Sequence, residues 1–150
     1  MQLKAIPGYQ YYYADTNGNI YSITPEKPRQ FFDIAKLHIT EIKPGIFEHN
    51  AAGKIKVKKL KPHPNRDGYL YVKLCLNGKC IDQKIHRLIL ITFKGKFPPG
   101  KETNHKDGNP HNNKLSNLEF MTHAENVQHA RDLERGKNYD YTKTKPGDPF

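Results

Sequence analysis

The chain has 150 residues, of which 35% are hydrophobic, and carries a formal net charge of +10 at pH 7. This length predicts one domain, or one domain with a small appendage. No run of 18 apolar residues occurs, which excludes a transmembrane helix, and residues 1–13 lack the apolar segment of a secretory signal. We therefore expect a soluble protein that stays inside the cell.

Positive charge is concentrated in the middle of the chain. Residues 54–101 hold thirteen Lys or Arg and two Asp, whereas residues 102–136 hold four basic and six acidic residues. Clustered Lys and Arg supply the salt-dependent part of nucleic-acid binding, although a plain solvated face has the same composition. A membrane surface is a poorer partner, because no basic amphipathic helix accompanies the charge.

The first part of the chain predicts short strands. Asn17-Gly18 between β-prone segments indicates a hairpin turn, and five prolines restrict residues 24–66 to short strands and loops. In residues 54–61, Ile55 and Val57 alternate with lysines. This alternation predicts a half-buried strand with a cationic outer face.

Residues 68–86 predict the clearest hairpin. A two-residue turn at Asn77-Gly78 sets a register that extends outward to the pair Tyr69 and His86. Side-chain alternation then assigns one face to the core and leaves the other face aromatic and basic. The predicted core face comprises Leu70, Val72, Leu74, Leu76, Ile81 and Ile85.

The two cysteines of the chain, Cys75 and Cys80, pair with each other in this register. Their pairing makes a disulfide conceivable under oxidation. They form no CxxC metal motif, and a reducing cytoplasm predicts two free thiols.

The C-terminal part predicts two strands and a helix. Residues 86–93 fit a buried helix or a strand, since their periodicity does not decide. A strand ending near Asn104-His105 precedes a polar loop, and residues 118–122 predict a second strand. The helix at 122–136 begins with the capping box Thr122 and Glu125 and ends before Gly136.

The polar loop belongs to the stretch TNHKDGNPHNNKLSNLEF at residues 103–120, which holds two His and five Asn. Such a composition is usual for surface loops, but here it lies between two patterned segments. The strand end, the loop and the first turns of the helix bring Asn104, His105, Asp107 and Asn126 into one small volume.

This stretch resembles the HNH endonucleases, in the subgroup common in phage genomes and introns. The resemblance lies in the pattern N-H-K-D-G-N-x-x-N-N-x-x-x-N-L followed by T-x-x-E-N. His105, Asn117 twelve residues later and Asn126 nine residues after that match the signature. The resemblance covers about residues 68–130, and residues 6–23 are similar, more weakly, to the module that often precedes this domain.

The resemblance implies an α+β fold in which short antiparallel strands and hairpins precede a ββα-metal nuclease unit. It also implies hydrolysis of DNA phosphodiester bonds with one divalent cation, Mg²⁺ or alternatively Mn²⁺. His105 would be the general base. Asn117 would tie the loop together and orient His105, and Asn126 would be a metal ligand on the helix.

Position 104 departs from the family pattern, in which this residue is frequently Asp. An amide oxygen binds hard cations more weakly than a carboxylate does, so we expect weak metal binding without DNA. We prefer Asn104 to Asp107 as the second ligand. His86 and His129 are further candidate contacts; the alternatives are a hydrogen-bonded residue at a helix start for His86 and a solvent-facing residue for His129.

The predicted organisation is a β-rich DNA-binding region at 1–66, the nuclease domain at 67–136 and a flexible tail at 137–150. The expected partner is double-stranded DNA, and the expected location is the cytoplasm, that of the host cell if a phage encodes the protein. The residues expected to contact DNA are Lys54, Lys56, Lys58, Lys59, Lys61, Arg66, Tyr69, Tyr71, Lys73, Lys84 and Arg87.

About fourteen residues follow the helix, too few for a further helical DNA-binding module. We therefore expect a monomer with limited sequence specificity. One site in a monomer favours nicking, and cutting of both strands stays open. The alternatives are a DNA-binding protein whose nuclease unit has decayed, which Asn104 keeps open, and a small structural protein.

Overall fold

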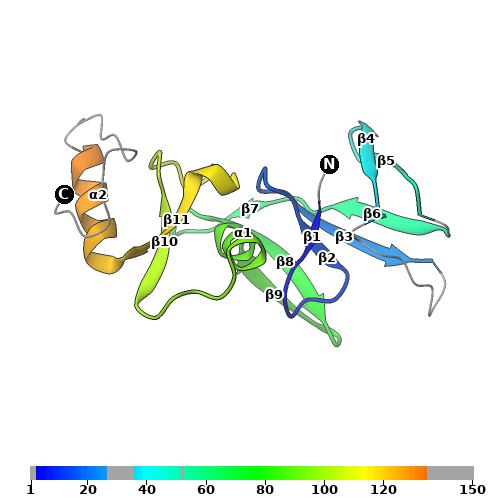
Figure 1. The fold of residues 1–150 in the computed structure, drawn as a ribbon, viewed down its shortest axis with the longest axis horizontal. Coiled ribbons are helices and arrows are strands. Elements are labelled where there is room, and N and C mark those ends of the chain that lie inside the picture. The colour runs from blue at the N-terminus through cyan, green and yellow to red at the C-terminus, as the bar shows by residue number, and fades with distance from the viewer. Residues whose placement is uncertain (1–2, 27–35, 52, 135–150) are drawn as a thin grey trace.

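The computed structural model describes residues 3–26, 36–51 and 53–134. Its fold is α+β, as predicted, with short antiparallel strands that lead into a C-terminal strand pair and helix. The elements lie along an elongated molecule, with α2 at one end and β4–β5 at the other (Figure 1). No described helix is long and apolar enough to span a membrane. The predicted helix end at Gly136 and the tail at 137–150 lie outside the described residues.

The strands are short, and all of their pairings are antiparallel. They are β1 (Lys4–Ala5), β2 (Tyr12–Ala14), β3 (Ile20–Pro25), β4 (Ile39–Lys43), β5 (Ile46–His49), β6 (Ile55–Lys59), β7 (His63–Pro64), β8 (Leu70–Leu76), β9 (Lys79–Lys84), β10 (Lys101–His105) and β11 (Leu118–Thr122). The helices are α1 (Ile85–Phe93) and α2 (His123–Glu134), and a 3₁₀ turn spans Leu115–Asn117. The sheets have the strand orders β1-β2-β3-β6, β7-β8-β9, β4-β5 and β10-β11.

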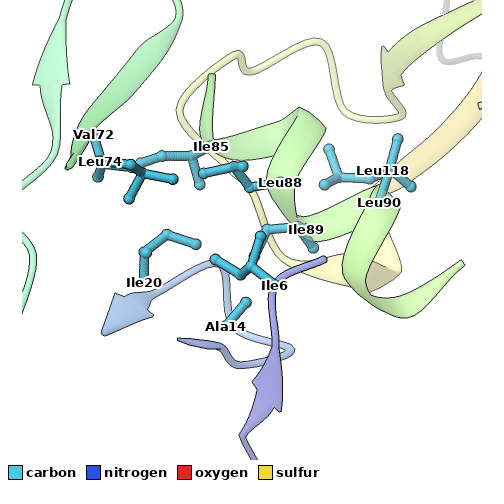
Figure 2. Packing of buried hydrophobic residues seen from close by; sticks show 10 residues of the cluster. All are labelled: Ile6, Ala14, Ile20, Val72, Leu74, Ile85, Leu88, Ile89, Leu90 and Leu118. Atoms are coloured by element: carbon cyan, nitrogen blue, oxygen red, sulfur yellow. The ribbon is translucent and has the colours of Figure 1, made fainter. Parts of the chain in front are cut away.

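The main hydrophobic core surrounds α1 (Figure 2). Most of the α1 side chains are buried, including the polar His86 and Thr92, which explains why the periodicity of this segment fits no single face. The fully buried members of the core are Ile6, Ala14, Ile20, Val72, Leu74, Ile85, Leu88, Ile89, Leu90 and Leu118. This core crosses the predicted boundary at residue 66, so the division into 1–66 and 67–136 stays a prediction.

The β2–β3 hairpin separates two cores because its side chains alternate. Ala14 and Ile20 face α1, whereas Tyr13 and Tyr21 join a second cluster with Leu37 and Ile39. The predicted turn is confirmed, and Gly18 adopts a φ of +88° at its tip. The Asp15 carboxylate accepts hydrogen bonds from the backbone N–H groups of Asn17 and Asn19, which closes this turn.

The β8–β9 hairpin has the predicted register around its turn, but it departs from the prediction in two ways. Leu76 and Ile81 were assigned to the core face, yet they are 37% and 52% exposed. Ile81 lies directly opposite the buried Leu74 but on the edge strand β9, so the core covers β8 at this level and leaves β9 exposed. Leu76 lies beside the turn. The expected pairing of Tyr69 with His86 does not form, because β9 ends at Lys84 and the chain turns into α1.

Cys75 and Cys80 form a disulfide, so the prediction of two free thiols is wrong. Their Cα atoms lie 4.0 Å apart in directly paired positions of β8 and β9. The backbone N–H of Cys75 donates to the Tyr12 hydroxyl at 2.9 Å and not across the ladder. The cysteines therefore occupy a non-hydrogen-bonded pair, where side chains approach most closely.

Candidate active site

The predicted ββα unit is present as β10, β11 and α2. Asn104 pairs with Glu119 and His105 pairs with Leu118 across the two strands. The Thr122 hydroxyl accepts from the backbone N–H of Glu125, and the Glu125 carboxylate accepts from that of Thr122. This reciprocal capping box begins α2 as predicted. Because neighbouring strand residues face opposite sides, Asn104 points toward α2 while His105 points toward α1.

His105 is buried at the end of β10, with 7% of its surface exposed. Its Nε2 lies 2.9 Å from Oδ1 of Asn113. An amide oxygen only accepts, so the ring hydrogen lies on Nε2 and the lone pair on Nδ1. Burial lowers the pKa of His105, and the bond to Asn113 opposes this effect in part. The ring is therefore neutral at neutral pH.

Two further rings pack against His105. His86 meets it edge to face at a centroid distance of 5.1 Å, and Tyr69 stacks on it at 5.9 Å. Burial, together with the positive charge that His105 can carry, lowers the pKa of His86 to about 3. Nδ1 of His86 is buried and has no hydrogen-bond partner among the described residues. The alternative of a hydrogen-bonded helix-start residue therefore finds no support at this atom.

The loop between β10 and β11 is held by Asn117 and Asp107. The Asn117 side chain accepts from the backbone N–H of Asp107 and donates to the Asp107 carboxylate and to the carbonyl of Asn112. Burial raises the pKa of Asp107, but bonds from Asn112, Asn109 and Asn117 outweigh it and lower this pKa. Asn117 ties the loop together as expected, whereas the direct bond to His105 comes from Asn113.

The turn of the N-terminal hairpin packs against this loop. The backbone N–H of Leu115 donates to the Thr16 carbonyl at 2.9 Å. A Cβ atom on Gly18 would lie 2.7 Å from the carbonyl oxygen of Asn113. Such a distance is far below ordinary contact, so the hairpin turn and the segment that carries Asn113 approach as closely as glycine allows.

On the opposite face, α2 covers Asn104. Nδ1 of His129 lies 2.7 Å from Oδ1 of Asn104, and the Asn104 amide donates to Glu119 at 2.9 Å. His129 is 2% exposed, so the alternative of a solvent-facing residue is wrong. Burial lowers the pKa of His129, and its surroundings, including the nearby Glu119 carboxylate, only partly offset this effect.

Asn126 lies one helical turn before His129. Its amide donates to the Glu102 carboxylate at 2.7 Å and to the Thr103 carbonyl at 3.1 Å. Asn126 on α2 thus contacts residues 102 and 103 of β10, whereas His129 contacts Asn104, the next residue of that strand. Both Asn side chains reach the face of β10 that α2 covers.

The donor set on this face suits a hard cation. It consists of amide and carboxylate oxygens, which Mg²⁺ and Mn²⁺ prefer. Within residues 3–26, 36–51 and 53–134, no three His, Cys, Asp or Glu side chains gather closely enough to hold a metal ion. A divalent cation held by the Asn oxygens would therefore need water and phosphate oxygens to complete its coordination shell, which is usual for Mg²⁺.

The basic residues predicted to contact DNA lie on several elements. A groove of about 630 Å³ between β6 and the β8–β9 hairpin is lined by Lys58, Lys59, Lys61, His63 and Lys73, with Asp82 as its acidic residue. Lys54, Lys56, Arg66 and Arg87 are exposed outside this lining.

The predicted contacts near His105 are arranged differently. Lys84 lies 4.9 Å above the ring of Tyr69 and 3.7 Å from the Asp67 carboxylate, which also accepts from the Tyr71 hydroxyl. These residues border the aromatic cluster of His86 and His105.

Sequence reasoning missed the roles of Asn113, Glu102 and Glu119. Asn113 belongs to the quoted motif, but nothing in its spacing distinguished it from Asn112 as the partner of His105. The strand register of β10 and β11 does predict that Glu119 faces position 104. With Leu118 opposite His105, one step forward along β11 and one step back along β10 places Glu119 opposite Asn104.

Comparisons with known proteins agree with this geometry. Residues 83–128 match the family model described as HNH endonuclease. An uncharacterized HNH endonuclease, L247, of Acanthamoeba polyphaga mimivirus is 45% identical over 83 residues, which is 52% of this chain and 20% of that protein. The DNA endonuclease I-HmuI of Bacillus phage SP01 is 38% identical over 71 residues, which is 47% of this chain and 41% of that protein.

The fold resembles a solved structure as well. The structure titled "DNA binding and cleavage by the HNH homing endonuclease I-HmuI" superposes with a TM-score of 0.58 and 28% sequence identity. The match covers 95% of this chain and 63% of that chain. The sequence matches to the two relatives described above span only 20% and 41% of the lengths of those proteins.

Proposed function

We propose that the chain is a metal-dependent endonuclease that hydrolyses phosphodiester bonds of duplex DNA, on the premise that residues 83–128 match the family model described as HNH endonuclease. The observation that carries this proposal is the state of His105. It is a buried, neutral imidazole whose Nε2 is bound to Asn113, at the end of a strand that also carries Asn104.

His105 acts as the general base. Since its hydrogen lies on Nε2, Nδ1 holds the lone pair that removes a proton from the attacking water. Asn113 keeps the ring in this tautomer, as the second partner of a base does in other hydrolases. The bond also stabilises the imidazolium that forms when the proton arrives. Asn117 contributes through the loop backbone, whose position it sets.

Asn104 and Asn126 would hold the cation, Mg²⁺ or Mn²⁺. When bound, this ion supplies charge stabilisation for the phosphate under attack and for the leaving oxygen. Asp107 is a weaker candidate, because its carboxylate already accepts bonds from Asn109, Asn112 and Asn117. His86 and Tyr69 pack on His105 and help to exclude water from its ring.

Double-stranded DNA is the proposed partner, and the cationic groove between β6 and β8–β9 is the surface that supports it. The lysines of the groove come from two separate strands and a connecting segment, so the positive charge lines opposing walls. Clustered Lys side chains of this kind bind phosphates independently of base sequence. We propose binding as a monomer with limited specificity and nicking of one strand.

Conversion of supercoiled plasmid to open-circle or linear DNA tests this function. Wild-type protein is incubated with Mg²⁺, Mn²⁺ or EDTA beside His105→Ala and a matched control, His111→Ala, which alters an exposed His of the same loop. We expect metal-dependent conversion that only His105→Ala abolishes while DNA binding persists. Binding without cleavage under both metals would favour a decayed nuclease unit instead.

A further inference from the structure

The metal ligands predicted from the family pattern share one feature that the pattern does not contain. The Asn104 amide donates to Glu119 at 2.9 Å, and the Asn126 amide donates to Glu102 at 2.7 Å. Each neutral amide is thus paired with one carboxylate.

This pairing sets the direction of each amide. A carboxylate only accepts hydrogen bonds, so it turns the NH₂ group of the amide toward itself and the oxygen away. At position 104 the oxygen consequently faces α2, where His129 donates to it. An amide oxygen has two lone pairs, and His129 uses one of them. The other is the one that would bind a cation.

The pairing also supplies charge. Position 104 is Asn where related nucleases frequently have Asp, so the negative charge that would attract a cation is missing from the ligand itself. Glu119 sits directly opposite Asn104 in the strand register and is half-buried, so its charge is only partly screened by solvent. A carboxylate that accepts from the amide NH₂ also polarises the amide oxygen.

We propose that Glu119, with Glu102 in the same relation to Asn126, is a positioning residue for the cation site. It holds the amide oxygen of Asn104 in the ligating direction and supplies the formal negative charge that residue 104 lacks. Residues that hydrogen-bond to metal ligands orient those ligands in this way. Loss of such a residue typically lowers metal affinity about 10–100-fold. This inference rests on the proposed function, because that function implies the cation.

The experiment measures Mn²⁺ binding to the full chain by electron paramagnetic resonance, with and without a short DNA duplex. The variants are Glu119→Gln, the double variant Asn104→Asp/Glu119→Gln, and the control Glu134→Gln, which removes an exposed carboxylate from α2. The double variant keeps one negative charge in the pair but moves it to residue 104. Thermal melting of each variant checks that it is folded.

We expect Glu119→Gln to weaken Mn²⁺ binding by about 10-fold or more. The double variant should recover most of the wild-type affinity, and Glu134→Gln should bind as the wild type does. A merely structural role of Glu119 would predict no recovery in the double variant. Wild-type affinity in Glu119→Gln, or no recovery in the double variant, overturns the proposal.

The outcomes separate this inference from the nuclease activity itself. A wild type that cleaves plasmid while Glu119→Gln binds Mn²⁺ normally leaves the nuclease intact and removes only the role of Glu119. A wild type that neither binds Mn²⁺ in the presence of DNA nor cleaves it overturns both.

Discussion

The loop at residues 106–117 and the tip of the β8–β9 hairpin differ in how polarity relates to burial. In the loop, Asn113 and Asn117 are polar but only 5% and 8% exposed. At the hairpin tip, Leu76 and Ile81 are apolar but 37% and 52% exposed. The buried amides have hydrogen-bond partners within reach, whereas Leu76 beside the turn and Ile81 on the edge strand β9 lie outside the hydrophobic core.

The contrast identifies what holds each region. A polar group can be buried without loss when each donor and acceptor finds a partner. The buried Asn side chains of the loop find theirs in His105, Asp107 and the backbone carbonyl of Asn112. An apolar residue contributes only when another element covers it. Composition alone therefore assigns the wrong environment to both regions, and four changes break or sharpen the comparison.

The largest effect is expected from removing packing that is present. Leu74→Ala on β8, where Leu74 is fully buried, should lower the free energy of unfolding by about 2–5 kcal/mol. Ile81→Ala, at the exposed position opposite Leu74 on the edge strand β9, should change it by less than about 0.5 kcal/mol. Urea unfolding of both variants measures the difference. Similar losses of unfolding free energy in the two variants would show that another part of the protein covers Ile81.

A smaller effect is expected from Asn117→Ala in the loop. This change leaves the Asp107 N–H and the Asn112 carbonyl without their partner in two part-buried hydrogen bonds, each of which contributes about 1 kcal/mol. We expect a loss of about 2–3 kcal/mol in unfolding free energy and a clear fall in cleavage. Asn109→Ala is the control, because the Asn109 side chain accepts an exposed bond. Equal losses of unfolding free energy and of cleavage in the two variants would contradict the role of Asn117 in holding the loop.

Acid should destabilise the site region before it affects the hairpin tip. Burial, with the positive charge that His105 can carry, lowers the pKa of His86 from 6.5 to about 3. The unfolded chain takes up a proton near pH 6.5 and the folded chain does not. The stability from this group is therefore complete above pH 6.5 and decreases as the pH falls toward about 3.

At pH 5 the loss from His86 alone is about 2 kcal/mol. His105 and His129 also have lowered pKa values and act in the same direction. Thermal melting at pH 7.5 and pH 5 measures the loss. His86→Phe, which takes up no proton, should lose less stability between these pH values, and an equal loss would remove His86 from the explanation.

The smallest effect concerns the disulfide at the hairpin tip. Cys75→Ser opens a short loop of the chain, for which the entropic model gives at most about 2 kcal/mol. Plasmid cleavage should persist, because Cys75 lines one side of the cationic groove but lies in a different sheet from β10, which carries His105. Comparison of Cys75→Ser with the wild type under reducing conditions checks both points. Loss of cleavage in the reduced wild type would show that the disulfide between Cys75 and Cys80 contributes to DNA cleavage.

Local patterns predicted the elements that depend on neighbouring residues. The Asn77-Gly78 turn, the capping box at Thr122 and the alternation of Ile55 and Val57 with lysines all act over a few residues. The signature spacing also anticipated that His105 and Asn104 end a strand beside a helix.

Features that depend on distant segments were not predictable in the same way. The helical state of residues 85–93 follows from burial on nearly every side, which erases its periodicity. The choice of Asn113 over Asn117 as partner of His105 follows from the path of the loop, and that path is set partly by the first hairpin. The buried apolar residues of the β8–β9 hairpin lie on β8 and not on the edge strand β9, which depends on how the distant elements of the core pack against it.

The contact between Gly18 and the Asn113 backbone bears on how such chains are assembled from parts. The family match begins at residue 83. The loop at residues 106–117 is nevertheless packed against the turn at Gly18, which lies more than sixty residues before the start of the match. If the N-terminal regions of two related proteins were exchanged, the loop would keep its conformation only if the new turn also had a glycine at the position of Gly18. The recognisable unit is thus smaller than the unit that can be transplanted.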